Sequence, residues 1–461
     1  MSEDGLARAR EKMTTAGVSG AAIEAFAHYY GELEQGATGL VPEAEIDPVT
    51  DLPVYEDIAV TPDQAREALG QTVFVKLNGG LGTSMGMSRA KSLLPVRDGL
   101  SFLDITVRQV LAARAEHDVR LPLLLMDSFN TQQDTLAALA AYPELPVDGL
   151  PLDFLQSQEP KLLASDLTPV SWPADPRLEW CPPGHGDIYP SLLGSGVLDL
   201  IVEQGYRYLA VSNGDNLGAA PDARIVGWFA STGAPYAAEV TPRTPMDRKG
   251  GHLAHRKSDG RLILRETAQT PPDEMRWFTD ETRHPFAHCN NLWLDAVRLR
   301  DTLRASSGVL GLPLIRNLKT VDPRDPSSPE VVQVESAMGA AVGVFEGATA
   351  LVVPRSRFLP VKGTAELLLV RSDVYDLRAD GTLERTVDQA PVVELGRSYK
   401  RIGDFEARFP AGPPSLARAQ RLDVAGDYTF GSDVVVVGDV TLPDDGAAHD
   451  VPDGSLLEGP R

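Results

Sequence analysis

The sequence is poor in cysteine, in long apolar runs and in positive charge, and each shortage excludes a class of protein. Cys181 and Cys289 are the only cysteines among 461 residues, too few for a disulfide framework and without metal-ligand spacing. The longest apolar runs, such as residues 121–126, have the length of a strand, and residues 1–17 lack an apolar signal core. We therefore expect a cytoplasmic protein that is neither secreted nor membrane-spanning.

Positive charge is scarce relative to negative charge. Lys and Arg number 43 against 65 Asp and Glu, so the formal net charge is −22. Such a chain repels nucleic acid and anionic membrane surfaces, and we expect neither as a partner. An acidic protein that handles phosphates must gather a few cations locally, which directs attention to single lysines and arginines near glycine-rich loops.

The length and pattern of the chain predict three structural units. Residues 1–70 read as a helical N-terminal extension and connector, because the first 36 are Ala-rich and charged at roughly helical spacing. From residue 71 to about 380, short apolar runs alternate with helical stretches, which predicts an α/β fold with a doubly wound, mostly parallel sheet. The expected strands lie near residues 73–77, 121–126, 152–156, 208–211 and 236–240.

The third unit, residues 381–461, has a weak internal repeat. Residues 424–427 (VAGD) recur twelve residues later as 436–439 (VVGD), with β-branched residues around them. Two coils of a β-helix of hexapeptide length are one interpretation. An ordinary antiparallel hairpin is the alternative that the sequence leaves open.

One helix shows the local logic within the second unit. Residues 102–117 carry apolar side chains at helical spacing, and Ser101 precedes them at the position where a side chain caps the first free amides. Ligands of open α/β sheets bind beyond the carboxyl ends of the strands, so the loops that follow strands should hold the chemistry.

The first such loop is rich in glycine. The expected strand 72–77 runs directly into NGGLGTSMG, residues 78–86. Glycines at a strand end let backbone amides turn toward a ligand and let phosphates approach closely. The spacing fits neither the dinucleotide fingerprint nor the Walker pattern. A structural turn is the alternative, but Lys91, nine residues beyond Gly82, places a point charge beside the loop and favours a phosphate site.

The chain resembles the eukaryotic-type UDP-glucose pyrophosphorylase family over most of its length. The resemblance is carried by ordered blocks: LNGGLGTSMG (77–86), VRDGLSFLD (96–104), SFNT (128–131), PPGHGDIY (182–189), VSNGDNLG (211–218), NNLW (290–293) and VPRSRFLPVK (353–362). It implies a nucleotidyltransferase fold, Rossmann-like, with a small C-terminal β-helix. The implied reaction joins UTP to glucose 1-phosphate and gives UDP-glucose and pyrophosphate. It also leaves open a homo-oligomer formed through the C-terminal domain.

Uridylyl transfer brings two anions together, so positioning and charge neutralisation must supply most of the catalysis. Asp215 follows the expected strand 208–211 in the turn NGDN, where a carboxylate can hold Mg²⁺ against the α-phosphate. A turn in which Asp215 only caps backbone amides is the structural alternative. By the resemblance, Lys91 and Lys362 hold phosphates from opposite sides, and Mg²⁺ is the expected cofactor.

The resemblance also assigns the UTP and sugar contacts. The UTP contacts would come from Leu77, Asn78, Gly79 and Gly80, from the backbone of Gly184 on the base, and from a glutamine on uracil. A carboxamide suits uracil because it pairs with both an imide N–H and a carbonyl. The matching position is Gln156, although Gln158 stands two residues away and is the alternative. The sugar phosphate would be held by His185, Asn213, Asn290 and Asn291, with Glu335 as a weaker candidate.

Two rival interpretations remain. One is the same reaction on another sugar phosphate, such as galactose 1-phosphate or N-acetylglucosamine 1-phosphate. Residues 81–84 (LGTS) disfavour the acetylamino sugar, whose pyrophosphorylases typically carry QGTR. The other rival is a nucleotide-sugar sensor without activity. The joint presence of Lys91, Asp215 and Lys362 disfavours a sensor, because a binder needs no metal and two lysines around a leaving pyrophosphate. Arg355 and Arg357 can equally be structural partners of acidic neighbours, and they are left out of the site.

Overall fold

The computed structural model describes residues 3–244, 247–248 and 250–459 of the 461-residue chain. Its helices are α1 (Glu3–Thr15), α2 (Gly20–Glu34), α3 (Pro62–Gly70), α4 (Phe102–His117), α5 (Gln132–Leu139), α6 (Ile188–Gly194), α7 (Val197–Glu203), α8 (Ala223–Thr232), α9 (Met275–Phe278), α10 (Ala296–Ala305), α11 (Thr364–Arg371) and α12 (Ile402–Arg408).

The strands of the catalytic region are β1 (Ile46–Pro48), β2 (Thr72–Asn78), β3 (Pro95–Arg97), β4 (Leu100–Ser101), β5 (Leu123–Asp127), β6 (Asp153–Leu155), β7 (Glu159–Pro160), β8 (Leu162–Leu163), β9 (Trp180–Cys181), β10 (Tyr208–Asn213), β11 (Tyr236–Pro242), β12 (His252–Arg256), β13 (Leu262–Arg265), β14 (Phe286–Asp295), β15 (Ile315–Thr320), β16 (Glu330–Glu335) and β17 (Thr349–Val352). Those that follow are β18 (Tyr375–Leu377), β19 (Leu383–Arg385), β20 (Val392–Leu395), β21 (Ser415–Val424), β22 (Asp427–Phe430), β23 (Val435–Leu442), β24 (Ala448–Val451) and β25 (Leu456–Glu458).

A central seven-stranded sheet has the order β17-β11-β14-β10-β2-β5-β6. Its strands are parallel except β14, which runs antiparallel to both β10 and β11. The prediction of a doubly wound, mostly parallel sheet is therefore confirmed, with β14 as an unpredicted antiparallel insertion. The strand order reverses beside β2, since β5 and β6 continue on one side and β10 on the other, and this is where open α/β sheets bind ligands.

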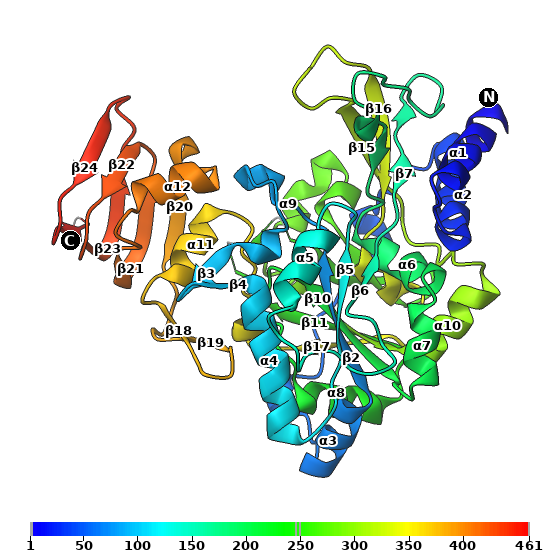
Figure 1. Cartoon of the computed structure of the whole chain (residues 1–461), viewed down its shortest axis with the longest axis horizontal. Helices are drawn as coiled ribbons and strands as arrows, with labels where there is room; N and C mark the ends of the chain where they lie inside the picture. The colour runs from blue at the N-terminus through cyan, green and yellow to red at the C-terminus, as the bar shows by residue number, and fades with distance from the viewer. Residues whose placement is uncertain (1–2, 245–246, 249, 460–461) are drawn as a thin grey trace.

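Helices cover both faces of this sheet, as Figure 1 shows with α7 and α10 on one side and α4 on the other. The alternation of side chains along β2 explains the two layers. Val73 and Val75 belong to the core beneath α2, α6, α7 and α10, whereas Phe74 belongs to the core beneath α3, α4 and α8. Lys76 shares the face of Phe74 and is 1% exposed, which is exceptional for a lysine.

Helix α4 forms where the sequence predicted it. The Ser101 hydroxyl accepts a hydrogen bond from the Asp104 backbone amide at 3.1 Å, and the Asp104 carboxylate accepts one from the Ser101 backbone amide at 2.8 Å. This reciprocal capping box satisfies two amides that a helix start leaves free. Tyr142 also donates to Asp104, so the helix start is joined to the segment that follows α5.

The N-terminal stretch is helical as predicted, but it consists of two helices. Gly17 takes a left-handed φ of +74° and ends the first helix, and Ser19 caps the second by accepting from the Ala22 amide. The pair packs against α6 and β7. In the described residues, every helix is too short or too polar to span a bilayer.

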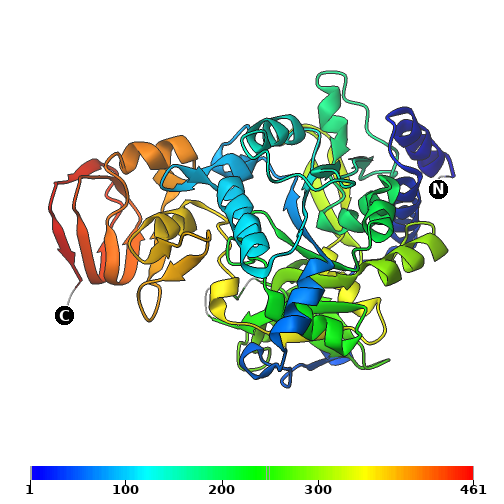
Figure 2. The same cartoon turned by 60° about the horizontal axis from the view of Figure 1, so that its bottom comes forward.

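The C-terminal strands lie at the far end from α1 and α2, as Figure 2 shows in red and blue. Strands β20, β21, β23 and β25 pair in parallel, and β22 pairs in parallel with β24. The parallel pairing confirms the β-helical interpretation over the hairpin. The twelve-residue repeat was the wrong period, however, because Val424 is paired with Leu442, eighteen residues on, and Gly438 with Ala419. The two VAGD-like segments therefore do not stack.

Candidate active site

The glycine loop and the NGDN turn meet at the strand-order reversal. Strands β2 and β10 are parallel neighbours, with Leu77 paired with Asn213. The Gly214 amide donates to the Leu77 carbonyl at 3.0 Å. A Cβ on Gly214 would lie 2.5 Å from that same oxygen, so only glycine permits the two loops to approach this closely.

Lys91 and Asp215 lie in direct contact at this point. The Lys91 Nζ donates to Asp215 Oδ2 at 2.7 Å and also donates to the Val361 carbonyl. The Lys91 amide donates to the Gly80 carbonyl at 3.0 Å, which fastens this lysine to the glycine loop. Both side chains keep some exposure, 16% for Lys91 and 24% for Asp215. A partly open ion pair of this kind can exchange its partners for phosphate and a cation.

Lys362 is next in the sequence to Val361, the residue that contacts both members of the Lys91–Asp215 pair. The Val361 amide donates to the Asp215 carbonyl at 3.2 Å, and Pro360 forms a bridge with Asn216. Lys362 itself is exposed. Burial raises the pKa of the nearby Glu266 carboxyl, and the positive charge of Lys362 opposes that rise. The three residues predicted to surround the triphosphate thus come from segments that contact one another.

The predicted uracil contact lies against the glycine loop. The Gln156 amide donates to the Asp127 carbonyl at 2.7 Å, which holds the end of β6 beside β5. A Cβ added at Gly79 would lie 2.5 Å from Gln156 Oε1. Gln156 and the open face of Gly79 therefore form one edge of the loop. Gly80 is exposed, and nothing lies within 4 Å of its missing Cβ.

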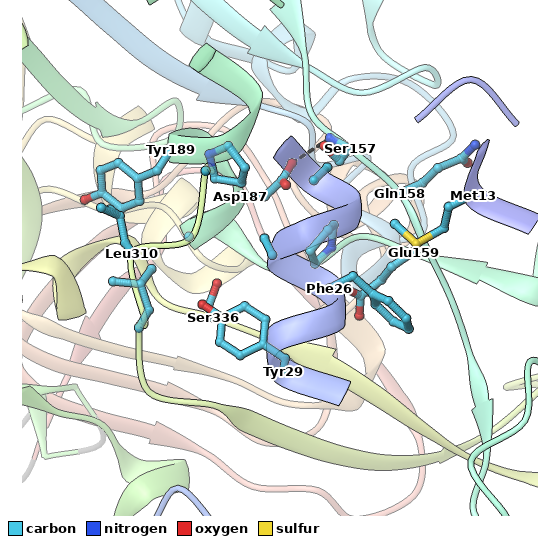
Figure 3. A pocket seen from close by; sticks show the side chains of 17 residues that line it. Met13, Phe26, Tyr29, Ser157, Gln158, Glu159, Asp187, Tyr189, Leu310 and Ser336 are labelled. Atoms are coloured by element: carbon cyan, nitrogen blue, oxygen red, sulfur yellow. Dashed lines mark hydrogen bonds between the residues drawn. The ribbon is translucent and has the colours of Figure 1, made fainter. Parts of the chain in front are cut away.

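Gln158 faces a different environment. It lines a small cavity between α2 and the segments 157–159, 183–190 and 308–312, together with Phe26 and Tyr29 (Figure 3). In that cavity the Ser157 amide donates to Asp187 Oδ2 at 2.6 Å, drawn as a dashed line. Because Gln156 is the glutamine next to the glycine loop, the geometry favours it over Gln158 as the base contact.

Two of the expected UTP residues have their polar groups committed within the protein. The Asn78 amide donates to Asp127 Oδ1 at 2.6 Å and to Thr135 Oγ1 at 2.9 Å, and the side chain is buried. Leu77 offers its carbonyl to Gly214, as described above. The side-chain N–H groups of Asn78 and the Leu77 carbonyl thus help to shape the loop, and contact of these two residues with UTP stays a prediction.

On the side where the sugar phosphate is predicted to bind, two backbone segments, 183–186 and 335–336, lie next to each other. The Gly186 amide donates to the Ser336 carbonyl at 2.8 Å, and the Ser336 amide donates to the Pro183 carbonyl at 3.0 Å. Gly184 has a φ of +78°, and a Cβ there would lie 2.6 Å from the Ser336 carbonyl oxygen and 3.1 Å from Glu335 Cβ. Both the left-handed φ and the lack of room for a Cβ require glycine at position 184. The close approach of the two segments also brings Glu335 next to Gly184.

His185 is held in one orientation. Its Nδ1 accepts a hydrogen bond from the Met338 amide at 2.9 Å, so Nε2 carries the ring proton. Burial lowers the pKa of His185 to about 4, and the ring is therefore neutral at physiological pH. The fixed tautomer leaves an N–H donor for a phosphate or hydroxyl oxygen.

The remaining predicted sugar residues divide into two sets. Asn213 ends β10, and Asn290 lies in the antiparallel neighbour β14, whose Leu292 is paired with Val211. Both are half-buried at the same sheet edge. Asn291, by contrast, is 2% exposed and donates to Glu239 Oε2 at 2.9 Å. Its role as a glucose contact stays a prediction, and its amide is already used inside the protein.

Sequence reasoning missed a buried polar network beneath the site. Glu239 accepts from Arg357 Nε and Nη2, both at 2.8 Å, and from Trp293 Nε1 at 2.9 Å. Burial alone would raise the pKa of Glu239, but the Arg357 guanidinium and the hydrogen bonds hold it below its usual value. The signal was present, because Glu239 interrupts an apolar run that was interpreted as a buried strand.

The backbone of the NGDN turn, residues 213–216, rests on this network. The Asn216 side chain donates to the Arg357 carbonyl at 3.2 Å and accepts from the Leu359 amide at 2.9 Å. The Lys76 Nζ donates to the carbonyls of Asn216 and Ala219 at 3.2 and 3.0 Å. Arg355 pairs in a bidentate manner with Asp247 at 2.6 and 2.9 Å. The interpretation of Arg355 and Arg357 as structural partners of acidic residues is confirmed.

The donor set at Asp215 fits a magnesium ion that binds together with a nucleotide. In the described part of the chain, no three His, Cys, Asp or Glu side chains cluster as a ready-made metal site. Mg²⁺ commonly takes one or two protein carboxylates and completes its octahedral shell with phosphate oxygens and water. A single, partly exposed carboxylate at a strand end matches that requirement.

The fold matches solved structures of known enzymes. The chain superimposes with a TM-score of 0.93 and 42% identity on the UDP-glucose pyrophosphorylase from Leishmania major in complex with UDP-glucose, covering 99% of each chain. A second structure, the UDP-glucose phosphorylase of Trypanosoma brucei, gives a TM-score of 0.91 and 39% identity over 98% of each chain. These likenesses define the class: the protein is a nucleotidyltransferase.

Curated relatives and a family profile narrow the class. The UTP–glucose-1-phosphate uridylyltransferase of Solanum tuberosum is 39% identical over 411 residues, which is 88% of this chain and 83% of that protein. The enzyme of Saccharomyces cerevisiae is 40% identical over 409 residues, 88% of this chain and 80% of that one. The profile of the same family matches residues 23–437. The chain belongs to the UTP–glucose-1-phosphate uridylyltransferase family.

Proposed function

We propose that this chain joins UTP to glucose 1-phosphate at the ends of β2 and β10, forming UDP-glucose and releasing pyrophosphate. The observation that carries the proposal is the meeting of Lys91, Asp215 and the segment that ends in Lys362, with contacts of 2.7 to 3.2 Å. Family membership and the fold support it.

The reaction needs no nucleophile from the protein. A phosphate oxygen of the sugar phosphate attacks the α-phosphorus of UTP, the new P–O bond forms as the bond to the β-phosphate oxygen breaks, and pyrophosphate leaves with the electron pair. Because both substrates are anions, the work of the protein is to orient them and to neutralise charge.

Lys91 has a defined part in this scheme. Without nucleotide it is held by Asp215 and by the Val361 carbonyl. When a triphosphate enters, the ammonium group turns from Asp215 to the phosphate oxygens, and the Asp215 carboxylate becomes free for Mg²⁺. The bound cation would neutralise charge on the α-phosphate and the leaving group. Lys362 holds the phosphates from the opposite side.

Residues of several further segments would bind the uracil base and the sugar phosphate. Gln156 pairs with uracil beside Gly79, with the Gly184 backbone on the other side of the base. The neutral His185 donates its Nε2–H to the sugar phosphate. Asn213 and Asn290 take glucose hydroxyls, and Glu335 lies close enough to Gly184 to join them.

We extend the proposal to location and assembly. Both cysteines are free and buried, which suits a reducing cytoplasm. Leu456 on β25 is 53% exposed at the end of the parallel C-terminal strands, where a contact between copies would cover it. Sedimentation of the purified chain at several concentrations distinguishes a monomer from such an oligomer.

The activity is tested by mixing purified protein with UTP, Mg²⁺ and one sugar 1-phosphate at a time, and by following pyrophosphate. We expect glucose 1-phosphate to give the highest kcat/KM, ahead of galactose 1-phosphate and N-acetylglucosamine 1-phosphate. A higher value for galactose would change the substrate assignment. If every sugar phosphate left pyrophosphate at background, the nucleotide-sugar sensor would be the correct interpretation.

A further inference from the structure

Strand β14 bulges next to the proposed sugar site. Its pairing with β11 joins Leu292 to Ala238 and His288 to Val240, so three residues of β14 stand opposite one residue of β11. At the centre of the bulge, Asn290 takes a left-handed φ of +54°. A non-glycine residue in this region is strained by about 1 kcal/mol or more and needs support from its surroundings.

His288 supplies that support with one ring nitrogen. The Asn290 amide donates to His288 Nδ1 at 3.2 Å, and the carboxamide Oδ1 of Asn290 lies 3.1 Å from the same nitrogen. The bulge removes the Asn290 backbone from the regular ladder. A neutral ring nitrogen either accepts or donates, so Nδ1 accepts from the Asn290 amide in one tautomer and donates to Asn290 Oδ1 in the other, and in either tautomer it holds Asn290. Few side chains can do this from two residues away.

The imidazole has little freedom to move. His288 is 5% exposed, and its own amide donates to the Gly251 carbonyl at 2.9 Å. A Cβ on Gly339 would lie 2.6 Å from His288 Cε1, so the ring fills the space that a glycine leaves. Among the described residues His288 Nε2 has no hydrogen-bond partner. The ring is thus kept in place by Nδ1 and by packing.

The ring also lies close to the other predicted sugar-phosphate residue. Burial lowers the pKa of His288, and a positive charge on His185 would lower it further, so the two rings are near one another. His185 accepts from the Met338 amide, one residue before Gly339. Segment 338–339 therefore lies between the two imidazoles. The phenolic hydroxyls of Tyr189 and Tyr236 donate to the carbonyls of Met338 and Gly339 at 2.6 and 3.2 Å, which makes this support rigid.

We propose that His288 is a positioning residue for the sugar: through one hydrogen bond at Nδ1 it holds Asn290 in its left-handed conformation, and the Asn290 carboxamide in turn contacts glucose hydroxyls. The proposal rests on the proposed function, because it takes Asn290 as a sugar contact. His288 does not touch the substrate, and the phosphate chemistry at Lys91 and Asp215 does not depend on it. Its loss should weaken binding of the sugar phosphate and leave binding of UTP intact.

The test compares His288→Phe with His288→Asn. Phenylalanine keeps a planar ring but removes Nδ1, whereas asparagine places an amide atom near the position of Nδ1. We expect His288→Phe to raise KM for glucose 1-phosphate about tenfold, the equivalent of one hydrogen bond lost around a strained residue. KM for UTP should stay within about twofold, and His288→Asn should restore most of the sugar affinity. Equal KM values for wild type and His288→Phe would overturn the inference.

A second pair of variants separates this inference from the proposed function. Asn290→Gly removes the carboxamide while tolerating the left-handed φ, and it should raise KM for glucose 1-phosphate by itself. In that background, adding His288→Phe should change KM by less than about twofold, because the residue it positions is gone. If Asn290→Gly has no effect, the sugar contact and the positioning role both fail. If the two changes multiply fully, His288 acts elsewhere and the positioning role fails alone.

Should His288→Phe not fold, His288→Gln replaces it, since its amide reaches past the Nδ1 position. A wild-type KM of His288→Gln for glucose 1-phosphate would overturn the inference.

Discussion

Lys76 is a buried lysine whose ammonium group donates to two backbone carbonyls. Replacing Lys76 by methionine should change how the stability of the protein depends on pH. Lys76 lies on β2 with 1% exposure. The pKa of Lys76 falls from 10.5 to about 7, chiefly because of burial and also because of the Arg357 charge, while Asp215 and Glu239 oppose the change. Methionine has a similar length and no charge.

The sign follows from the two pKa values. Below pH 7 the folded protein must hold a buried charge that the unfolded chain holds in water, so folding carries the full cost. As pH rises from 7 toward 10.5, the unfolded chain binds more protons than the folded one, and wild-type stability rises. For pKa values of 10.5 and about 7, the cost is about 4 kcal/mol at pH 7 and about 2 kcal/mol at pH 9.

Urea unfolding of wild type and Lys76→Met, without nucleotide or metal, measures the difference at both pH values. Methionine loses two hydrogen bonds at either pH, so that loss cancels in the comparison. We expect the wild type to gain about 2 kcal/mol relative to the variant between pH 7 and pH 9. The exposed Lys400→Met is the matched control and should show a constant difference. A constant difference for Lys76→Met as well would refute the reasoning.

Two further changes test the uracil edge and the buried network. Gly79→Ala should raise KM for UTP at least about tenfold, because its Cβ would lie 2.5 Å from Gln156 Oε1. The control Gly80→Ala meets nothing within 4 Å and should leave KM near wild type. Equal KM values in the two variants would argue against Gln156 as the uracil contact. Arg357→Met should lower the free energy of unfolding by about 3 to 5 kcal/mol, because Glu239 would remain buried without its ion-pair partner. If denaturant titration showed that this free energy falls by less than about 1 kcal/mol, the ion pair would be dispensable for stability.

Local patterns predicted much of the central sheet. The expected strand at 208–211 became β10 (Tyr208–Asn213), and the helix at 102–117 formed with the predicted Ser101 cap. These elements were legible because apolar period, capping residue and turn residues agreed with one another. Strand β14 was not predicted, because polar residues at 288, 290 and 291 and the bulge around Asn290 interrupt its alternation.

The site divides in the same way. Lys91, Asp215 and Lys362 were predicted from the sequence, since motifs at strand ends carry both local geometry and chemistry; the structure brings their segments into contact, and their roles stay predictions. The network beneath them was predicted only in part. Pairing of Arg357 with an acidic residue was one interpretation of the sequence, but Glu239 and Lys76 lie on separate strands, and only the tertiary structure brings them close to Arg357. The twelve-residue repeat misled for a related reason: the similarity of two short segments says nothing about which residues stack in adjacent coils.

The most direct measurement is the turnover of Asp215→Asn with UTP, glucose 1-phosphate and a titration of Mg²⁺. Asparagine preserves the shape of the side chain but removes the charge that holds Lys91 and would hold the cation. We expect kcat to fall by at least about a hundredfold at every Mg²⁺ concentration, in a protein whose unfolding midpoint is unchanged. Turnover close to wild type with an ordinary Mg²⁺ dependence would show that the uridylyl transfer does not take place around Asp215.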